Sequence, residues 1–463
     1  MDLLADIGHA DQLTSAREEN RVLQSKVKEL SVRVHELLAE NQALKAEVEI
    51  YREEFKRGGL SGHGLAEDGK EEFVDVEKED DDVEDFITSG SGIYPCDPAV
   101  VLSHVHGAAN PLCCSINPDD SLLATGGADS SLNLCRWGLA LAPGDESSAK
   151  AVTDAIRIPC SGPVICVSFA RVDNGRAFPV VAAGCMDGSV CLAYCGLDLD
   201  AATESKDRVL RPEVGNDCNG INQHGIKHGR YVKTVCWSPS APLLASASAD
   251  GTVQLTRVGD GALSGENFCG RVSMEIIQSI HFDSPVEAMC FLDNGDTLCC
   301  YVRGTSYLSY FNLKDGFKQT KYSLNGGSSG TGCFGDHISF AVLSLCPSPN
   351  GGKYLALATD TSRNIIMETG TDRIVRNLYG HKNDGYSNPK IAWSSSGQYL
   401  YGTSQDENCV CVWDIASSSI VKKLDEGNGG HTGLVRDIYS SHNSDTVATV
   451  SFDKSARVWL RDI

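Results

Sequence analysis

The sequence lacks the features that identify membrane, secreted and nucleic-acid-binding proteins. No apolar run approaches the ~18 residues that a membrane span needs. Residues 1–6 contain neither a basic region nor the beginning of a long apolar core, so we expect no signal peptide. Basic residues are scarce relative to acidic ones. The resulting net charge of -22 argues against binding to the phosphate backbone of a nucleic acid.

Motifs for catalysis and for cofactor binding are also missing or out of context. Residues 330–335 have the glycine spacing of a dinucleotide fold, but a strand pattern follows them where a helix is required. We find no nucleophile elbow, zinc-protease motif or phosphate loop. Cys409 and Cys411 alternate along a strand, and no second Cys or His pair follows at zinc-finger spacing. The sequence therefore predicts a non-enzymatic protein without catalytic residues, cofactor or metal.

Cysteine, in contrast, is abundant. The chain has 463 residues and 19 cysteines, and many of these lie within apolar runs such as Cys113-Cys114 and Cys299-Cys300. This pattern indicates free thiols in a reducing, intracellular compartment. We expect a cytoplasmic protein, with the nucleus as the alternative.

Residues 380–414 contain the pattern around which the C-terminal part of the chain is organised. Gly380-His381 begins it, two strand-like runs follow, and Asp406 lies in a turn before a third run that ends in Trp413-Asp414. This layout resembles one blade of a WD-repeat propeller. The resemblance implies an all-β fold and a role in binding other proteins.

The same pattern recurs along the chain. An apolar residue precedes an Asp by six positions at Asp129, Asp187, Asp250, Asp406 and Asp453, and two further copies have Gly304 and Thr361 at that offset. Seven copies predict a seven-bladed propeller over residues 93–463, with six or eight blades as the alternative. The last copy lacks an outer strand, which residues 99–103 could supply to close the ring.

In WD repeats, a His, a strand Ser or Thr, the turn Asp and a Trp form a hydrogen-bonded network. The resemblance assigns this structural role to two sets of residues, which are His381, Ser404, Asp406 and Trp413, and His431, Ser451, Asp453 and Trp459. Buried Asp and His side chains are tolerated only when each finds partners. We therefore expect both sets to stabilise blades and not to catalyse a reaction.

Residues 1–57 carry six heptad repeats of a coiled coil. Val predominates at a and Leu at d, which favours a parallel two-stranded coil, and two buried Asn residues at a fix its register. The expected interface residues are Leu13, Asn20, Leu23, Val27, Leu30, Val34, Leu37, Asn41, Leu44, Val48 and Tyr51. The partner helix comes from a second copy of this chain or from a different protein. A single amphipathic helix packed on the propeller is the remaining alternative.

Residues 58–92 are glycine-rich and then strongly acidic, which predicts a linker without a core of its own. Within it, acidic residues precede Phe73-Val74-Asp75-Val76. This segment resembles the short motifs with which autophagy receptors add a strand to a partner sheet. A solvated linker is the plainer interpretation.

These features together predict a scaffold or adaptor in which a coiled-coil dimer presents propellers to protein partners. Four insertions, at residues 138–154, 197–230, 259–272 and 324–335, are expected to be exposed loops, which either contact those partners or are plain surface excursions. One alternative is the substrate receptor of a ubiquitin ligase, although such receptors often carry an Arg where Ala416 follows Trp413-Asp414. The other is a scaffold of autophagy or membrane trafficking.

Overall fold

The computed structural model describes residues 92, 94–138, 155–170, 180–195, 209–212, 225–259, 271–292, 295–325, 338–349 and 351–460. The predicted coiled coil (residues 1–57), the acidic linker apart from Gly92, and the motif at residues 73–76 lie outside these ranges. None of the helices within the described ranges is long and apolar enough to cross a membrane.

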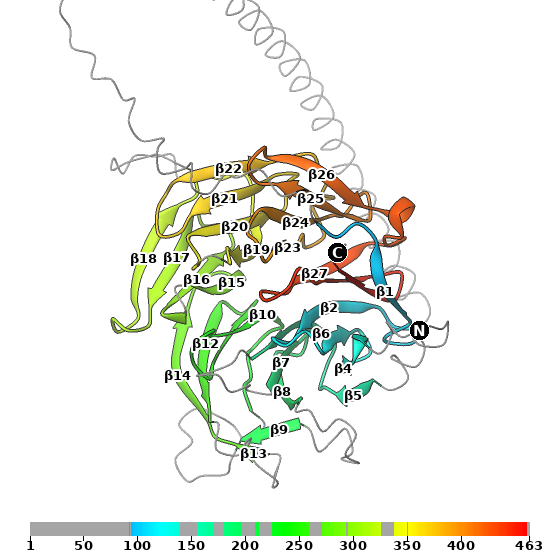
Figure 1. Ribbon diagram of the computed structural model, residues 1–463. Coiled ribbons are helices and arrows are strands. Elements are labelled where there is room, and N and C mark those ends of the chain that lie inside the picture. Colours follow the sequence, from blue (N-terminus) through cyan, green and yellow to red (C-terminus); the bar gives the residue numbers. More distant parts are fainter. Residues whose placement is uncertain are drawn as a thin grey trace, which may run out of the picture. The chain divides into compact units, whose positions relative to one another are not determined.

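Seven sheets surround a common axis, and each sheet is one blade of a propeller (Figure 1). The innermost strands are β2 (Pro111–Ile116), β6 (Val164–Phe169), β10 (Val232–Trp237), β15 (Val286–Leu292), β19 (Val342–Pro347), β23 (Ile391–Trp393) and β27 (Val435–Ser440). Each innermost strand contacts those of the two neighbouring blades, and β27 contacts β2, so the cycle is closed. The prediction of an all-β, seven-bladed propeller is confirmed.

Three further strands follow each innermost strand outward. The second strands are β3 (Leu123–Gly127), β7 (Val180–Cys185), β11 (Leu243–Ser248), β16 (Thr297–Val302), β20 (Tyr354–Thr359), β24 (Tyr399–Ser404) and β28 (Val447–Ser451). The third strands are β4 (Ser131–Cys135), β8 (Val190–Tyr194), β12 (Thr252–Val258), β17 (Tyr307–Asn312), β21 (Asn364–Glu368), β25 (Cys409–Asp414) and β29 (Ser455–Trp459). The outer strands of blades one to six are β5 (Ile156–Pro159), β9 (Val209–Pro212), β14 (Met274–His281), β18 (Lys318–Ser323), β22 (Ile374–Leu378) and β26 (Ser419–Leu424). A short 3-10 helix, Glu426–Asn428, follows β26.

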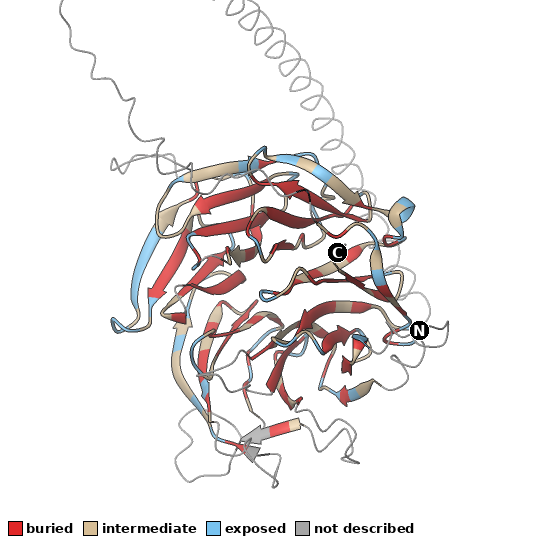
Figure 2. Cartoon of the chain, viewed as in Figure 1, coloured by how far each residue is buried: buried red, intermediate tan, exposed pale blue. Residues whose placement is uncertain are grey.

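Burial explains which runs of sequence became which strands. Every residue of β7, β20 and β24 is buried, because each blade packs face to face on both neighbours, and such strands need apolar or small residues throughout. The outer strand β18, with the sequence Lys-Gln-Thr-Lys-Tyr-Ser, is mostly exposed. Figure 2 shows this gradient from buried inner strands to exposed outer ones.

The strand β1 (Pro98–Ser103) closes the ring. It pairs antiparallel with β29 of the seventh blade, with Val100 opposite Val458 and Leu102 opposite Ala456. Both Val100 and Leu102 are buried, whereas Ala99 and Ser103 are exposed. The sequence prediction that residues 99–103 supply the missing outer strand is therefore confirmed.

Two of the four insertions differ from the exposed loops that the sequence predicts. Residues 209–212 form β9, and residues 271–272 form the two-residue strand β13 (Arg271–Val272), which pairs parallel with β9. Leu210 and Val272 are buried. Blade two thus has five strands, the fifth donated by the insertion within blade three. Because both insertions are polar overall, their composition did not predict these two short strands.

Candidate functional site

The seventh blade contains a hydrogen-bonded network at one end of its strands. His431 lies with Nδ1 2.8 Å from Asp453 Oδ2 and Nε2 2.8 Å from Thr449 Oγ1. The Trp459 indole donates to the same Thr449 hydroxyl at 2.9 Å, and the Ser455 hydroxyl donates to Asp453 at 2.7 Å. The loop before β27 supplies His431, and the turn between β28 and β29 supplies Asp453. The network therefore ties two neighbouring connections together.

The electrostatics of this network fix its protonation. Burial lowers the pKa of His431 more than the attraction of Asp453 raises it, so the imidazole is neutral at pH 7. Burial raises the pKa of Asp453, but hydrogen bonds from His431 and Ser455 outweigh it and hold that pKa below its usual range. Nδ1–H of a neutral His431 therefore donates to an ionised Asp453. The contact is a charge-assisted hydrogen bond, not an ion pair between two charged side chains.

Ser451, which the sequence analysis placed in this network, does not contact His431. Its hydroxyl donates to the Gly433 carbonyl at 2.8 Å and accepts from the Asp453 N–H at 3.2 Å. The network uses the hydroxyls four residues before the Asp and two residues after it, which are Thr449 and Ser455. The prediction for Ser451 was wrong because its hydroxyl is used locally, in hydrogen bonds with backbone groups next to the turn.

Two more blades contain the same arrangement, which the sequence analysis missed. In blade one, His106 contacts Asp129 and Thr125, both at 3.0 Å. In blade three, His228 contacts Thr252 at 2.7 Å and Ser246 at 2.8 Å, and its Nδ1 lies 3.8 Å from Asp250. Both histidines precede a glycine (His106-Gly107 and His228-Gly229), whereas the sequence search sought Gly-His. The spaced hydroxyls around each Asp could have revealed them.

Blade six departs from this arrangement. Asp406 is exposed and its backbone N–H donates to the Lys382 carbonyl at 3.2 Å, so the predicted network of His381, Ser404, Asp406 and Trp413 is not formed. The backbone shows which residue of blade six takes the position of the turn acid. In four other turns the residue directly after the Asp has a positive φ, and these pairs are Asp129-Ser130, Asp187-Gly188, Asp250-Gly251 and Asp453-Lys454. In blade six the residue with a positive φ is Asn408, and it follows Glu407. The turn is one residue longer, and Glu407 takes the position of the acid.

The hydroxyl two residues after the acid is replaced as well. Ser131, Ser189, Thr252 and Ser455 donate to their acids at 2.6–2.8 Å. In blade six this position is Cys409, whose thiol lies 3.9 Å from Glu407 Oε2. Gly402 occupies the position of Thr449, the threonine that bonds the histidine in blade seven. The strand pairing shows this equivalence, since Gly402 pairs with Cys411 and Thr449 pairs with Arg457, each four residues after the acid of its turn. His381 thus loses its usual partners, and both of its ring nitrogens lack a hydrogen-bond partner among the described residues.

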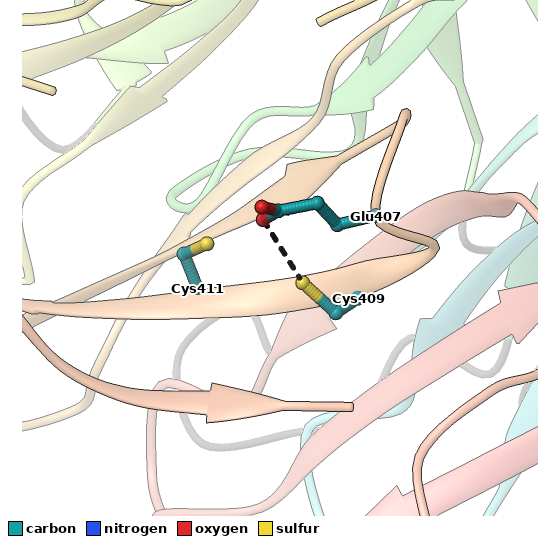
Figure 3. A group of neighbouring side chains, drawn as sticks. All are labelled: Glu407, Cys409 and Cys411. Carbon is teal, nitrogen blue, oxygen red and sulfur yellow. Dashed lines mark hydrogen bonds between the residues drawn. The ribbon is translucent and has the colours of Figure 1, made fainter. Parts of the chain in front are cut away.

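Cys409, Cys411 and Glu407 form a compact group (Figure 3). One ligand atom from each lies within 4.8 Å of those of the other two, and both sulfur atoms point to the same side of β25. A hydrogen bond between the thiols lowers the pKa of Cys409 and raises that of Cys411. Lys423 Nζ lies 2.7 Å from Glu407 Oε2, which places a positive charge beside the group.

The His and turn Asp of blades one, three and seven define one face of the propeller, which we call the His–Asp face. Because the strands of a blade are antiparallel, the loop that enters the innermost strand and the turn between the second and third strands share this end. Exposed apolar side chains lie in these connections: Met186, Tyr386 and Phe452 are 57%, 95% and 39% exposed. The Arg436 guanidinium lies 5.2 Å from the centre of the Phe452 ring.

Charged side chains lie at the inner edge of this face. Six innermost strands have a bulge near their first residue, and the bulged residues are Leu112, Ile165, Lys233, Glu287, Leu343 and Arg436. Lys233 and Glu287 come from neighbouring blades and meet at 2.5 Å, and Arg303 approaches the same carboxylate at 2.7 Å. A buried carboxylate between two cations is well compensated. The inner edge of the face is therefore charged in blades three, four and seven and apolar at Leu112, Ile165 and Leu343.

The His–Asp–hydroxyl arrangement resembles a catalytic triad in composition but not in accessibility. Thr449 and Ser131 are buried, and the Thr449 oxygen already accepts the Trp459 N–H. A nucleophile must reach its substrate, and these hydroxyls face the packed interior of a blade. The networks of the described residues therefore stabilise turns.

A comparison with protein-family models matches the chain to one described as WD domain, G-beta repeat, at residues 100–135, 221–256 and 421–459. The search of curated proteins returned no match. The three matched segments contain β2 to β4, β10, β11 and most of β12, and β27 to β29, which belong to the three blades where a His lies beside the turn Asp. The family pattern and the hydrogen-bond geometry thus select the same three repeats.

Proposed function

Because this chain is a seven-bladed propeller with WD40 repeats, we propose that it is a non-enzymatic scaffold that binds protein partners through its His–Asp face. Propellers of this kind generally serve as protein-interaction domains. Every cysteine that the structure describes has a free thiol, which supports a cytoplasmic location. The remaining question is which surface receives the partner.

The observation that carries the proposal is the distribution of exposed apolar side chains. The large apolar side chains exposed among the described residues are Met186, Tyr379, Tyr386, Val421 and Phe452. All but Val421 lie in connections at the His–Asp face. Aromatic and Met side chains are enriched in the energetically dominant parts of protein interfaces. Arg436 beside Phe452 adds a second residue type that is typical of such sites.

The docking surface can be tested by affinity purification of the full chain from cells, followed by mass spectrometry. We expect Tyr386→Ser combined with Phe452→Ser to reduce recovery of specific partners by tenfold or more, because hot-spot residues contribute about 2 kcal/mol or more each. Val421→Ser, on the outer strand β26, is the matched control and should retain every partner. Unchanged recovery with the double variant would place the docking surface elsewhere. Ligase subunits or trafficking proteins among the partners would identify the process.

We also propose that residues 12–57 form a parallel dimer, on the basis of the heptad pattern. Leu30→Glu together with Leu37→Glu puts charges into two d layers, so we expect the mass measured by light scattering to fall from that of a dimer to that of a monomer. Val32→Glu with Ala39→Glu changes two outward f positions and should leave a dimer. A monomeric unsubstituted chain would instead indicate that the helix pairs with a different protein.

Two propellers on one dimer would bind a repetitive partner more tightly than one. The second contact becomes intramolecular, and avidity can exceed the affinity of a single site by roughly 10²–10⁴-fold when both propellers engage. The acidic composition of residues 58–92 supports a spacer between coil and propeller. This bivalence gives the scaffold its proposed advantage.

A further inference from the structure

Blade six contains a group of side chains that neither the fold nor the proposed docking surface requires. We propose that Cys409, Cys411 and Glu407, together with His381, bind a zinc ion. The three ligand atoms in Figure 3 already lie within 4.8 Å of one another. This proposal reverses our expectation from sequence that no metal site is present, and it does not depend on the scaffold function.

The group arises from two changes to the repeated turn. Where the other turns have Asp and a hydroxyl, blade six has Glu407 and Cys409, so a longer carboxylate meets a thiol. Alternation along β25 adds Cys411 on the same side of the strand, because residues i and i+2 of a strand share a face. Two thiolates on one tetrahedral zinc at about 2.3 Å lie less than about 4 Å apart. Small side-chain rotations from the observed positions would suffice.

Unpartnered polar atoms next to the group provide a second, independent observation. His381 is 2% exposed, and neither of its ring nitrogens has a hydrogen-bond partner among the described residues. In blades one and seven the equivalent Nδ1 contacts the turn acid and the following hydroxyl. The positions equivalent to those partners are here Glu407 and Cys409.

Asn364 of blade five adds to this polar neighbourhood. Its amide nitrogen lies 3.2 Å from the position that a Cβ would occupy on Gly402, the residue paired with Cys411. Its Oδ1 is buried and has no partner within the described part of the chain. Buried polar atoms without partners are costly in a protein interior, and a group of them points to a ligand. The apolar residues between blades five and six would enclose that ligand.

The chemistry of the donors selects a soft or borderline divalent cation. Thiolates disfavour Mg²⁺ and Ca²⁺, whereas two sulfurs with a carboxylate and an imidazole suit Zn²⁺. Both thiols must lose a proton, so binding releases two protons and becomes tighter as pH rises. With two thiolates, one carboxylate and Zn²⁺, the occupied site has a net charge of about -1. Lys423, 2.7 Å from Glu407, would offset that charge.

Cobalt provides the test, because Co²⁺ occupies zinc sites and its absorption reports thiolate ligands. We expect the reduced full chain to bind one Co²⁺ with a thiolate-to-cobalt charge-transfer band that stoichiometric Zn²⁺ abolishes. Cys409→Ser and Cys411→Ser should each lower the affinity for Zn²⁺ by more than about 100-fold, and Glu407→Gln by about 10–100-fold. Glu407→Gln changes a partly exposed side chain, so it remains informative if the cysteine variants fold poorly.

Cys290→Ser is the matched control. Cys290 and Cys299 are opposite each other on β15 and β16 and form a hydrogen-bonded thiol pair without a carboxylate. The control should retain the cobalt band and the zinc affinity. The proposal is overturned by the absence of a charge-transfer band in the unsubstituted chain, or by a band that Cys290→Ser removes and Glu407→Gln does not weaken. Neither the cobalt band nor the zinc affinity tests the docking proposal, because recovery of partners is measured separately.

Discussion

Leu102→Asp should lower the free energy of unfolding by about 4 kcal/mol or more, the largest effect that we expect from a single residue of β1. Leu102 is fully buried between β29 and the first blade, and an unpaired carboxylate there loses both apolar contacts and hydration. The ring would then lose the strand that joins its beginning to its end. Urea unfolding of the full chain, followed by tryptophan fluorescence, measures the change.

Ala99→Asp provides the control for that experiment. Ala99 lies on the same strand but is exposed, so the substitution should change the free energy of unfolding by no more than about 0.5 kcal/mol. Equal stability of the two variants would contradict the role of β1 in closure. A loss confined to Leu102→Asp would show that the propeller is held closed by apolar contacts of this strand, in addition to its backbone hydrogen bonds.

The sequence was sufficient for the number of blades and for closure, because both depend on local patterns. Apolar runs separated by turns repeat at similar spacing, and the missing outer strand of the last copy required a strand from elsewhere. Blades four and five were recognised although neither has an Asp at the expected offset in the turn. Their strands had to be apolar regardless of the turn, since each blade is covered by its neighbours on both faces.

The candidate site was harder to predict because it depends on single positions within turns. One additional residue in the turn after β24 moves Asp406 out to solvent and Glu407 into the position of the acid. An offset counted from the preceding apolar residue cannot detect this shift. The zinc proposal likewise rests on Asn364, which lies against Gly402 opposite Cys411, and on His381, which interacts electrostatically with Glu407. Both residues come from other strands and loops. Sequence spacing alone gives no indication of that proximity.

The pair Asp453 and Asp406 tests this distinction directly. We expect Asp453→Ala to lower the free energy of unfolding by about 3 kcal/mol, because it leaves His431, Ser455 and the Thr432 N–H without their shared acceptor. Asp406→Ala removes an exposed side chain and should cost no more than about 0.5 kcal/mol. Chemical unfolding of both variants at pH 7 measures the difference. Similar losses for the two would mean that both acids take part in networks.

The pH dependence of the stability lost in Asp453→Ala provides a second test of the network. The folded-state pKa of Asp453 is depressed, so its contribution is fully present above the unfolded pKa of about 3.9 and is lost as pH falls through the lower, folded value. The stability gap between the unsubstituted chain and Asp453→Ala should therefore be constant from about pH 7 to pH 5 and narrow below about pH 4. His431 also has a depressed pKa, so its neutral form stabilises the fold above about pH 6.5 and this contribution declines in acid. Because the histidine remains in both proteins, a gap that widened as pH fell through about 6.5 would assign the contribution of Asp453 to an ion pair with protonated His431. Narrowing that begins only near pH 4 would support the charge-assisted hydrogen bond from a neutral imidazole.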